Sequence, residues 1–301
     1  MRKGDKIALI TPASPITEEK LKIAIENVEK LGCIPVFSQN VLLNKGYLAG
    51  DDKVRATEIH KYFEDKNIKA IWAIRGGYGC ARLLPYLDFG FIAQFPKIFA
   101  GYSDLTVLLN SIERLCNFST FHAPMAGGFI NDYSFAQFKD VLKNNKRGID
   151  FVQTTGYEDY IIGEGKSTGK LVGGNLTLIA SLCGTRWEVK MKGAILFLED
   201  VGESPYRIDR LLTQLLQNSE LQKVRGIIIG CCKDCEKKVD DNQSLTLKEV
   251  LYDRLAELNI PIVYGFPFGH TENICTLPLG AKVVFHTNDK KIKIENYVFK
   301  K

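Results

Sequence analysis

Short β-rich runs alternate with helical patterns in the first part of the chain, and this alternation constrains the fold more than any other feature. The expected strands cover residues 6–11, 34–37, 69–74 and 97–101. The expected helices cover residues 18–31, 53–65 and 104–115. Strands that alternate with helices form βαβ units. We therefore expect a mostly parallel sheet with helices on both of its faces.

The pattern breaks between residues 143 and 170, where KNNKRG is polar and TTGYEDYIIGEGKSTG is rich in turn residues. Beyond the break, helical patterns alternate with strand patterns again, and the turn at Asn288–Asp289 predicts a closing hairpin. The expected helices lie near residues 175–183, 208–216 and 245–258, and the expected strands at 194–198, 226–230 and 261–265. We expect an α/β fold with an N-terminal domain at 1–145, a linker at 146–168 and a smaller C-terminal domain at 169–301.

Composition and charge argue against a nucleic-acid-binding, membrane or secreted protein. The net charge of +5 over 301 residues is a weak field, and no Lys/Arg block carries interleaved aromatics, so we expect no nucleic-acid partner. No apolar run approaches the roughly 20 residues of a membrane helix. The start, MRKGDKIALITPAS, resembles a signal peptide only superficially, because its apolar stretch is short and follows Asp5. We expect a cytoplasmic protein whose eight cysteines are free thiols.

The first candidate for chemistry is Ser103 in the segment AGYSD. A β-rich run stops at Gly101 and a helical pattern starts directly after Ser103. A serine on such a turn projects its hydroxyl above the sheet and lies at a helix N-terminus, which stabilises a developing anion. The alternative is that Ser103 or Asp104 merely caps the helix, since both residue types are preferred caps.

A serine nucleophile needs a base, and the chain has four histidines. His60 lies in a charged helical pattern and His286 in the terminal hairpin, where we expect both to be solvated. His122 follows a strand and is either near a site or buried in the core. His270 stands in a loop rich in Gly, Pro and Phe after a strand, where open α/β folds place reactive groups, so it is the favoured base.

The histidine in turn needs a carboxylate that holds its tautomer. Glu199 ends an apolar strand in LFLEDVGE and is the favoured residue. Asp200 and Glu203 are its rivals, although for these two we favour capping of the following helix.

A glycine cluster, Gly76, Gly77 and Gly79 in IRGGYGCARL, follows a strand and opens a helix. Backbone N–H groups in such a turn can bind an oxyanion or a phosphate. The segment matches neither a Walker loop nor a complete G-x-G-x-x-G pattern. By pattern alone it is a tight turn.

A cluster of three cysteines and the single Cys80 also need an interpretation. Cys231, Cys232 and Cys235 suggest zinc, but a structural zinc site usually needs four ligands and no matching Cys/His pair lies nearby, so we expect no metal. Cys80 follows the glycine turn and is a possible nucleophile, but nothing in the sequence singles out a histidine beside it.

Six segments, in this order, resemble the L,D-carboxypeptidases of serine peptidase family S66, which include the microcin-immunity peptidases. They are ALITPASP, AIRGGYGCARLLPYLD, GYSDLT, GKLVGGNLTLIASLCGT, ILFLEDVGESPYRIDR and GHTENICTLPLG. Together they span nearly the whole chain. Six matches in order are far more specific than any one of them.

The resemblance implies a catalytic triad of Ser103, Glu199 and His270. It also implies an oxyanion hole formed by the backbone N–H groups of Gly77 and Asp104. The loop near the substrate would consist of Gly173, Gly174 and Asn175. The implied fold is an N-terminal parallel-sheet domain of the class I glutamine amidotransferase-like or flavodoxin-like type, with a smaller C-terminal α/β domain. The active site is expected in the cleft between them, and a homodimer is expected as in other family members.

The implied reaction is hydrolysis of the L,D bond to the terminal D-alanine of the murein tetrapeptide in cell-wall recycling, without a metal or cofactor. Whether the peptide carries diaminopimelate or lysine stays open, as does the presence of an attached sugar. One alternative is a microcin C-type immunity peptidase that cleaves a peptidyl-nucleotide amide, although the short loop around Trp187 argues against it. The others are a non-catalytic anion-binding protein and a metal enzyme.

Overall fold

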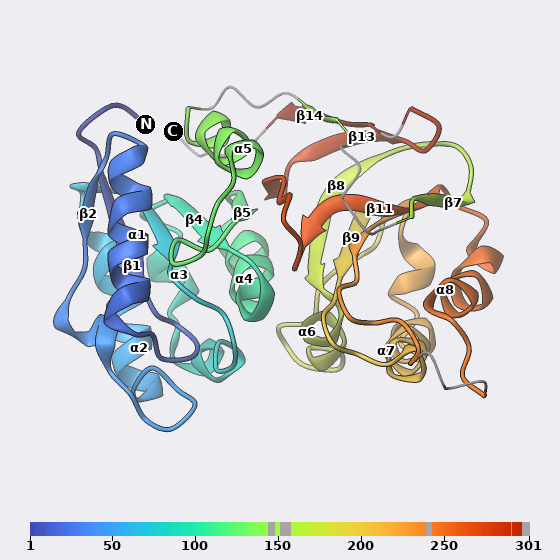
Figure 1. Ribbon diagram of the computed structural model, residues 1–301, viewed down its shortest axis with the longest axis horizontal. Coiled ribbons are helices and arrows are strands. Elements are labelled where there is room, and N and C mark those ends of the chain that lie inside the picture. Colours follow the sequence, from blue (N-terminus) through green and yellow to red (C-terminus); the bar gives the residue numbers. More distant parts are fainter. Residues whose placement is uncertain (144–147, 151–157, 239–242, 290, 297–301) are drawn as a thin grey trace. The chain divides into compact units, whose positions relative to one another are not determined.

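The structure is a computed structural model that describes residues 1–143, 148–150, 158–238, 243–289 and 291–296. Its internal contacts divide these residues into two compact units. The first unit holds residues 1–143 and 275–280, and the second holds the other described residues. Each unit has its own sheet (Figure 1).

The first unit contains a six-stranded sheet in the order β12-β5-β4-β3-β1-β2. Its strands are β1 (Lys6–Ile10), β2 (Ile34–Val36), β3 (Ile68–Ala73), β4 (Ile98–Gly101), β5 (Thr120–His122) and β12 (Leu277–Leu279). Its α-helices are α1 (Glu18–Lys30), α2 (Asp52–Glu64), α3 (Phe89–Ile92), α4 (Thr106–Cys116) and α5 (Asp132–Leu142). All pairings are parallel except β12 with β5. The order 2-1-3-4-5 is flavodoxin-like, which confirms the expected fold class.

Local sequence explains the elements of the first unit. Thr17 caps α1, because its side-chain oxygen accepts a hydrogen bond from the Lys20 N–H group. Strand β3 reads IKAIWA and is buried at five of its six positions, as expected for a central parallel strand. Its Trp72 is fully buried, has its ring centroid 4.6 Å from that of Phe138 and donates its indole N–H to the Pro124 carbonyl at 2.7 Å. This core holds the carboxyl ends of β1, β3 and β4 in place.

The second unit contains an eight-stranded mixed sheet in the order β6-β14-β13-β8-β9-β10-β11-β7. Its strands are β6 (Gly148–Asp150), β7 (Tyr160–Gly163), β8 (Lys166–Asn175), β9 (Ile195–Glu199), β10 (Gly226–Cys231), β11 (Ile262–Gly269), β13 (Lys282–His286) and β14 (Lys291–Asn296). Strands β8 to β11 are parallel, and the β13–β14 hairpin confirms the turn predicted at Asn288–Asp289. Helices α6 (Leu176–Ser181), α7 (Pro205–Gln217) and α8 (Leu247–Leu255) pack in sequence on one side of the sheet (Figure 1).

Two segments differ from the sequence expectations. The expected linker at 146–168 contributes β6, β7 and the start of β8 to the second sheet, and its residues 146–147 and 151–157 lie outside the described residues. Gly165 has φ +139° in the turn between β7 and β8. Strand β12, far along the chain, pairs with β5 and so completes the first sheet.

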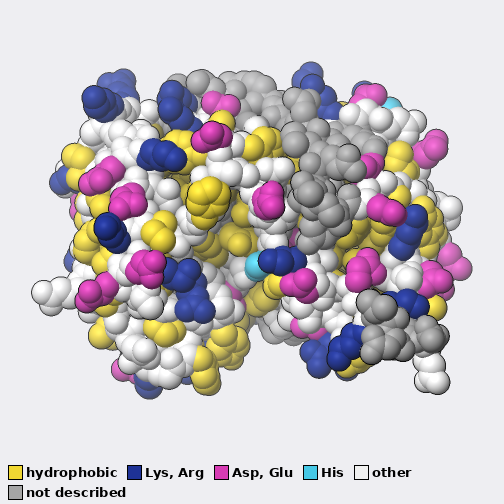
Figure 2. Space-filling model, viewed as in Figure 1, with side chains coloured by type: hydrophobic (Ala, Val, Ile, Leu, Met, Phe, Trp, Pro, Cys, Tyr) yellow, Lys and Arg dark blue, Asp and Glu magenta, His cyan; other side chains and the backbone are white. Residues whose placement is uncertain are grey.

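The surface agrees with the weak net charge. Figure 2 shows acidic and basic side chains interspersed over the face in view. Within the described residues, no helix is both long and apolar enough to cross a bilayer.

Candidate active site

Ser103 lies on the turn that joins β4 to α4, at the start of a short 3₁₀ segment (Ser103–Leu105). Its backbone has φ +60°, a left-handed conformation that costs a non-glycine residue on the order of 1 kcal/mol. A strained serine between a strand and a helix is the geometry of a nucleophile elbow. The structure therefore presents Ser103 as a candidate nucleophile and not as an ordinary cap.

Asp104 is buried, and its carboxylate accepts a hydrogen bond from the Cys80 N–H group at 2.8 Å. The alternative that the Asp104 side chain caps the helix is therefore wrong, because the carboxylate reaches across to another loop. Burial raises the pKa of this carboxyl group, against the lowering effect of the Cys80 hydrogen bond. The side chain thereby links the serine turn to the loop after β3.

That loop, residues 76–80, is named the glycine loop here. A Cβ atom placed on Gly76 would lie 3.2 Å from the Ser103 Oγ atom, so the loop passes directly beside the hydroxyl. Gly77 has φ +109°, and a Cβ atom there would lie 2.3 Å from the Ser14 Oγ atom. Ser14 also accepts a hydrogen bond from the Tyr78 N–H group at 3.1 Å.

The glycine loop lies at a place in the first sheet where ligands commonly bind. It follows β3, and Ser14 follows β1, so both lie at the point where the strand order of the first sheet reverses. Open parallel sheets bind ligands at the carboxyl ends of the strands at this switch point. Ser14 was not singled out by the sequence analysis, although its place directly after a strand is a usable signal.

In the second unit, Glu199 and His270 form a close pair. Strand β9 ends at Glu199, β11 ends at Gly269, and β10 lies between them. The His270 Nδ1 atom lies 2.7 Å from a Glu199 carboxylate oxygen. The Glu199 side chain is fully buried, whereas that of His270 is 20% exposed. A buried carboxylate on Nδ1 is how a catalytic histidine is held so that Nε2 can act as the base.

Strand β11 is longer than the sequence predicts, because residues 266–269 were expected to be loop. Its register with β10 shifts twice, between Ile229 and Gly230 and again between Gly230 and Cys231. Such bulges accommodate glycine and proline without ending a strand. The bulged strand delivers His270 directly at its end.

Gly173, Gly174 and Asn175 were expected in a loop, but they form the last three residues of β8. A Cβ atom on Gly173 would lie 1.9 Å from the Phe197 carbonyl oxygen, so close backbone approach requires glycine there. Asn175 is paired in register with Glu199 and caps α6, since its Oδ1 atom accepts from the Leu178 N–H group at 3.1 Å.

Asp200 stabilises the same corner. Its carboxylate accepts hydrogen bonds from the Asn175 side chain, from the Thr177 N–H and hydroxyl groups and from the Val201 N–H group, all at 2.8–2.9 Å. Burial raises the pKa of its carboxyl group. The expectation that Asp200 caps the following helix is wrong, because it supports the start of α6 instead.

The other histidines have different surroundings. His122 lies in β5 and is fully buried, which agrees with the interpretation that it is a core residue. His60 was expected to be solvated, but its Nε2 atom accepts a hydrogen bond from the Asp88 N–H group at 2.9 Å, and burial lowers its pKa. His286 lies in β13 and is partly buried, and its Nδ1 atom accepts from the Asp289 N–H group at 3.3 Å.

The eight cysteines can be placed in the structure. All eight lie within the described residues and are free thiols, as expected. No group of metal-ligating side chains was found among the described residues. Cys80 is fully buried, and desolvation raises the pKa of its thiol, which opposes a role as nucleophile. Several effects raise the pKa of the Cys232 thiol: the largest is its hydrogen bond with Cys235, and the next is burial.

Comparison with known proteins places these features in a family context. Residues 7–123 match the LD-carboxypeptidase N-terminal domain, and residues 168–285 match the LD-carboxypeptidase C-terminal domain. A probable murein peptide carboxypeptidase of Bacillus subtilis is 35% identical, with 98% of this chain and 93% of the relative covered.

Two solved structures share the fold over nearly their full length. A muramoyltetrapeptide carboxypeptidase from Oxalobacter formigenes aligns with a TM-score of 0.86 and 29% identity, covering 98% of this chain and 100% of the other. The microcin C7 self-immunity protein MccF, in complex with glutamyl sulfamoyl guanosine, aligns with a TM-score of 0.89 and 26% identity. That alignment covers 99% of this chain and 98% of the other.

Proposed function

Because the chain belongs to the LD-carboxypeptidases of serine peptidase family S66, we propose that it removes the terminal D-alanine of the murein tetrapeptide. The chain is a serine-type carboxypeptidase by family, and the substrate and mechanism are the proposal. The observation that carries it is the Glu199–His270 pair, in which a fully buried carboxylate holds the Nδ1 atom of a partly exposed imidazole. Such a pair is built to support a base.

In the proposed mechanism, the Ser103 hydroxyl attacks the carbonyl carbon of the diamino acid while His270 accepts its proton. The N–H groups of Gly77 and Asp104 stabilise the oxyanion of the tetrahedral intermediate. The C–N bond then breaks, and D-alanine leaves with the proton from His270. Water hydrolyses the ester with His270 again as the base, which restores the Ser103 hydroxyl.

Two features support these assignments. The glycine loop passes beside the Ser103 hydroxyl, and Asp104 lies in the first turn of the 3₁₀ segment, where N–H groups lack helical acceptors. We further propose that the end of β8, Gly173, Gly174 and Asn175, borders the bound peptide, because Asn175 pairs in register with Glu199.

The test compares the wild-type protein with Ser103→Ala on L-Ala-γ-D-Glu-diaminopimelate-D-Ala, with products identified by mass spectrometry. We expect loss of one D-alanine with the wild type and a fall in kcat of about 10⁶ in the variant. A loss of only a few-fold would refute Ser103 as the nucleophile. Cleavage of the lysine peptide alone would correct the substrate but leave the reaction standing.

A second candidate function is hydrolysis of an aminoacyl-nucleotide, as suggested by the structural likeness to the microcin self-immunity protein. One observation favours it: Trp187 is partly exposed, and the Arg186 guanidinium lies 4.4 Å from its ring centroid. A cationic group on an aromatic ring is a surface on which a nucleobase can stack. Turnover of an aminoacyl-sulfamoyl adenylate, measured beside the tetrapeptide, separates the two.

Two further properties are proposed: a cytoplasmic location, from the sequence features, and a homodimeric state, from the resemblance. Light scattering of the purified protein tests the dimer, and a mass of about one chain at micromolar concentration would exclude it. Cell fractionation tests the location.

A further inference from the structure

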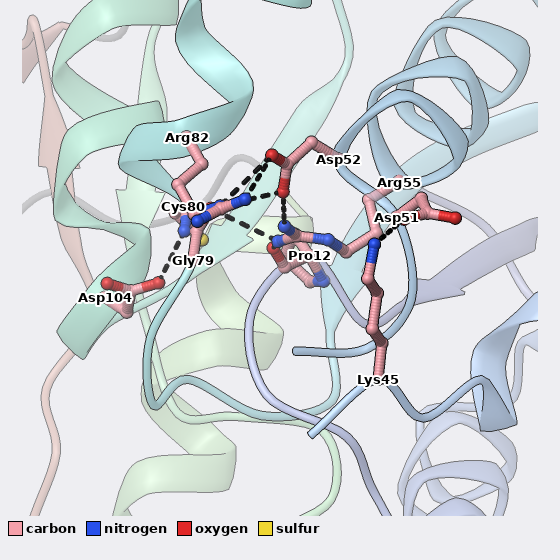
Figure 3. A network of polar contacts seen from close by, with 9 residues as sticks. All are labelled: Pro12, Lys45, Asp51, Asp52, Arg55, Gly79, Cys80, Arg82 and Asp104. Atoms are coloured by element: carbon pink, nitrogen blue, oxygen red, sulfur yellow. Dashed lines mark hydrogen bonds and ion pairs between the residues drawn. The ribbon is translucent and has the colours of Figure 1, made fainter. Parts of the chain in front are cut away.

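Arg55 lies on α2 with a side chain that is only 2% exposed, and a buried guanidinium needs partners for its charge and its donors. Its Nη1 atom donates to the carbonyl oxygens of both Pro12 and Gly79, the latter at 3.2 Å. Its Nη2 atom forms an ion pair with Asp52. Figure 3 shows these contacts converging on one guanidinium.

The two carbonyl groups come from different loops. Pro12 follows β1, and Gly79 lies in the glycine loop after β3, and these two strands are neighbours in the sheet. The guanidinium therefore ties the two loops together at the switch point. The loop that carries Ser14 and the loop that carries Gly77 are thus joined by both Arg55 and the Ser14–Tyr78 hydrogen bond.

Asp52 balances the charge of Arg55 and also binds Arg82, which follows the glycine loop in the chain. Asp52 accepts from the Arg82 Nε atom at 3.0 Å and from its Nη2 atom at 2.8 Å. The hydrogen bond from Arg82 lowers the pKa of Asp52, so this carboxylate stays ionised at neutral pH. Arg82 belongs to the 3₁₀ segment Ala81–Tyr86 directly after the loop.

The opposite side of the glycine loop is held by Asp104, which accepts from the Cys80 N–H group at 2.8 Å. Arg55 from α2 and Asp104 from the serine turn therefore grip adjacent residues, Gly79 and Cys80 (Figure 3). A loop fixed at these two points has little freedom at Gly77, two residues away.

We propose that Arg55 is a positioning residue for the oxyanion site, acting through the glycine loop. The inference rests on the proposed function, in which the Gly77 N–H group stabilises the oxyanion. The contacts of Arg55 are with the backbone of the two loops and with Asp52, and it is not a member of the proposed triad. Its effect is on where the Gly77 N–H group points, and an oxyanion donor gives its stabilisation only when it is already oriented.

The test uses Arg55→Met, which removes both carbonyl contacts, and Arg55→Lys, which keeps the charge and a shorter donor. Lys61→Met is the matched control, because it removes one positive charge from the same helix at an exposed position. Steady-state kcat and KM on the tetrapeptide are measured together with amide hydrogen exchange of the segment that contains residues 76–80.

We expect kcat of Arg55→Met to fall by roughly 10- to 100-fold, a part of the 10²–10³ lost with a whole oxyanion donor. KM should stay within about twofold, because the oxyanion exists only in the transition state. Hydrogen exchange should quicken in the glycine loop and not throughout the unit. Arg55→Lys should recover part of kcat, and Lys61→Met should match the wild type.

Three results would overturn the inference: an unchanged kcat, a rise in KM alone, or exchange that quickens over the whole unit in proportion to lost stability. If the wild-type protein cleaves no murein peptide, the proposed function fails. Hydrogen exchange then still decides on Arg55, since acceleration confined to the glycine loop supports the anchoring and its absence refutes it.

Discussion

The Nδ1 atom of His270 lies 2.7 Å from a carboxylate oxygen of Glu199, although 71 positions separate the two residues in the chain. The contact arises because β9 and β11 flank β10 and end at the same edge of the sheet. A fully buried carboxylate in this place can orient the imidazole, which is the role that we propose for Glu199.

Glu199→Gln should lower kcat by about 10³–10⁴, because an amide in place of the carboxylate favours the wrong histidine tautomer, as in other serine triads. The measurement is steady-state hydrolysis of the tetrapeptide. Glu203→Gln is the control, since Glu203 lies four positions away and pairs with Arg207 on α7 at 3.4 Å. Equal activity of the two variants would remove Glu199 from the proposed triad.

Ser103→Gly should be more stable than Ser103→Ala by roughly 1 kcal/mol, because glycine adopts φ +60° without the strain that a Cβ atom causes. Both variants should be inactive, so the difference reports strain and not catalysis. Urea denaturation of the two proteins gives the free energies of unfolding. Equal values would show that the turn carries no strain at this residue.

Gly173→Ala should prevent stable folding or cost several kcal/mol, since its Cβ atom would lie 1.9 Å from the Phe197 carbonyl oxygen. Gly184→Ala is the matched control, because Gly184 also has positive φ, +76°, but nothing lies within 4 Å of its Cβ position. That variant should lose only about 1–2 kcal/mol. Thermal unfolding compares them, and similar losses would contradict the close approach of β8 and β9.

Asp104→Asn should change how stability depends on pH. Burial raises the pKa of Asp104, so its contribution to stability is fully present below the unfolded pKa of about 4 and is lost as pH rises through the folded value. Asparagine does not titrate. The variant should therefore gain stability relative to the wild type as pH rises above about 4, as measured by urea denaturation at several pH values. A difference that is constant over this range would argue against the raised pKa.

Much of the fold follows from local patterns. Strands β1 to β4 and helices α1, α2 and α4 were predicted within a few residues, because parallel strands are continuous apolar runs and helices carry caps and amphipathic faces. The flavodoxin-like order of the first sheet and the hairpin at Asn288–Asp289 agree with the prediction. Glu199, His270 and Ser103 were placed at strand ends by pattern, and their joint role stays a prediction from family resemblance.

The sequence by itself determined the order and type of the elements and the strand ends on which reactive residues lie. These features depend on residues that are close together in the chain. Only the tertiary structure decided that β12 joins the first sheet, that β7 and part of the expected linker join the second, and that Asp200 supports α6. The tertiary structure alone also revealed that Arg55 is buried between two loops. These contacts join residues distant along the chain, and their partners are chosen by packing and hydrogen-bond satisfaction, which no local pattern encodes.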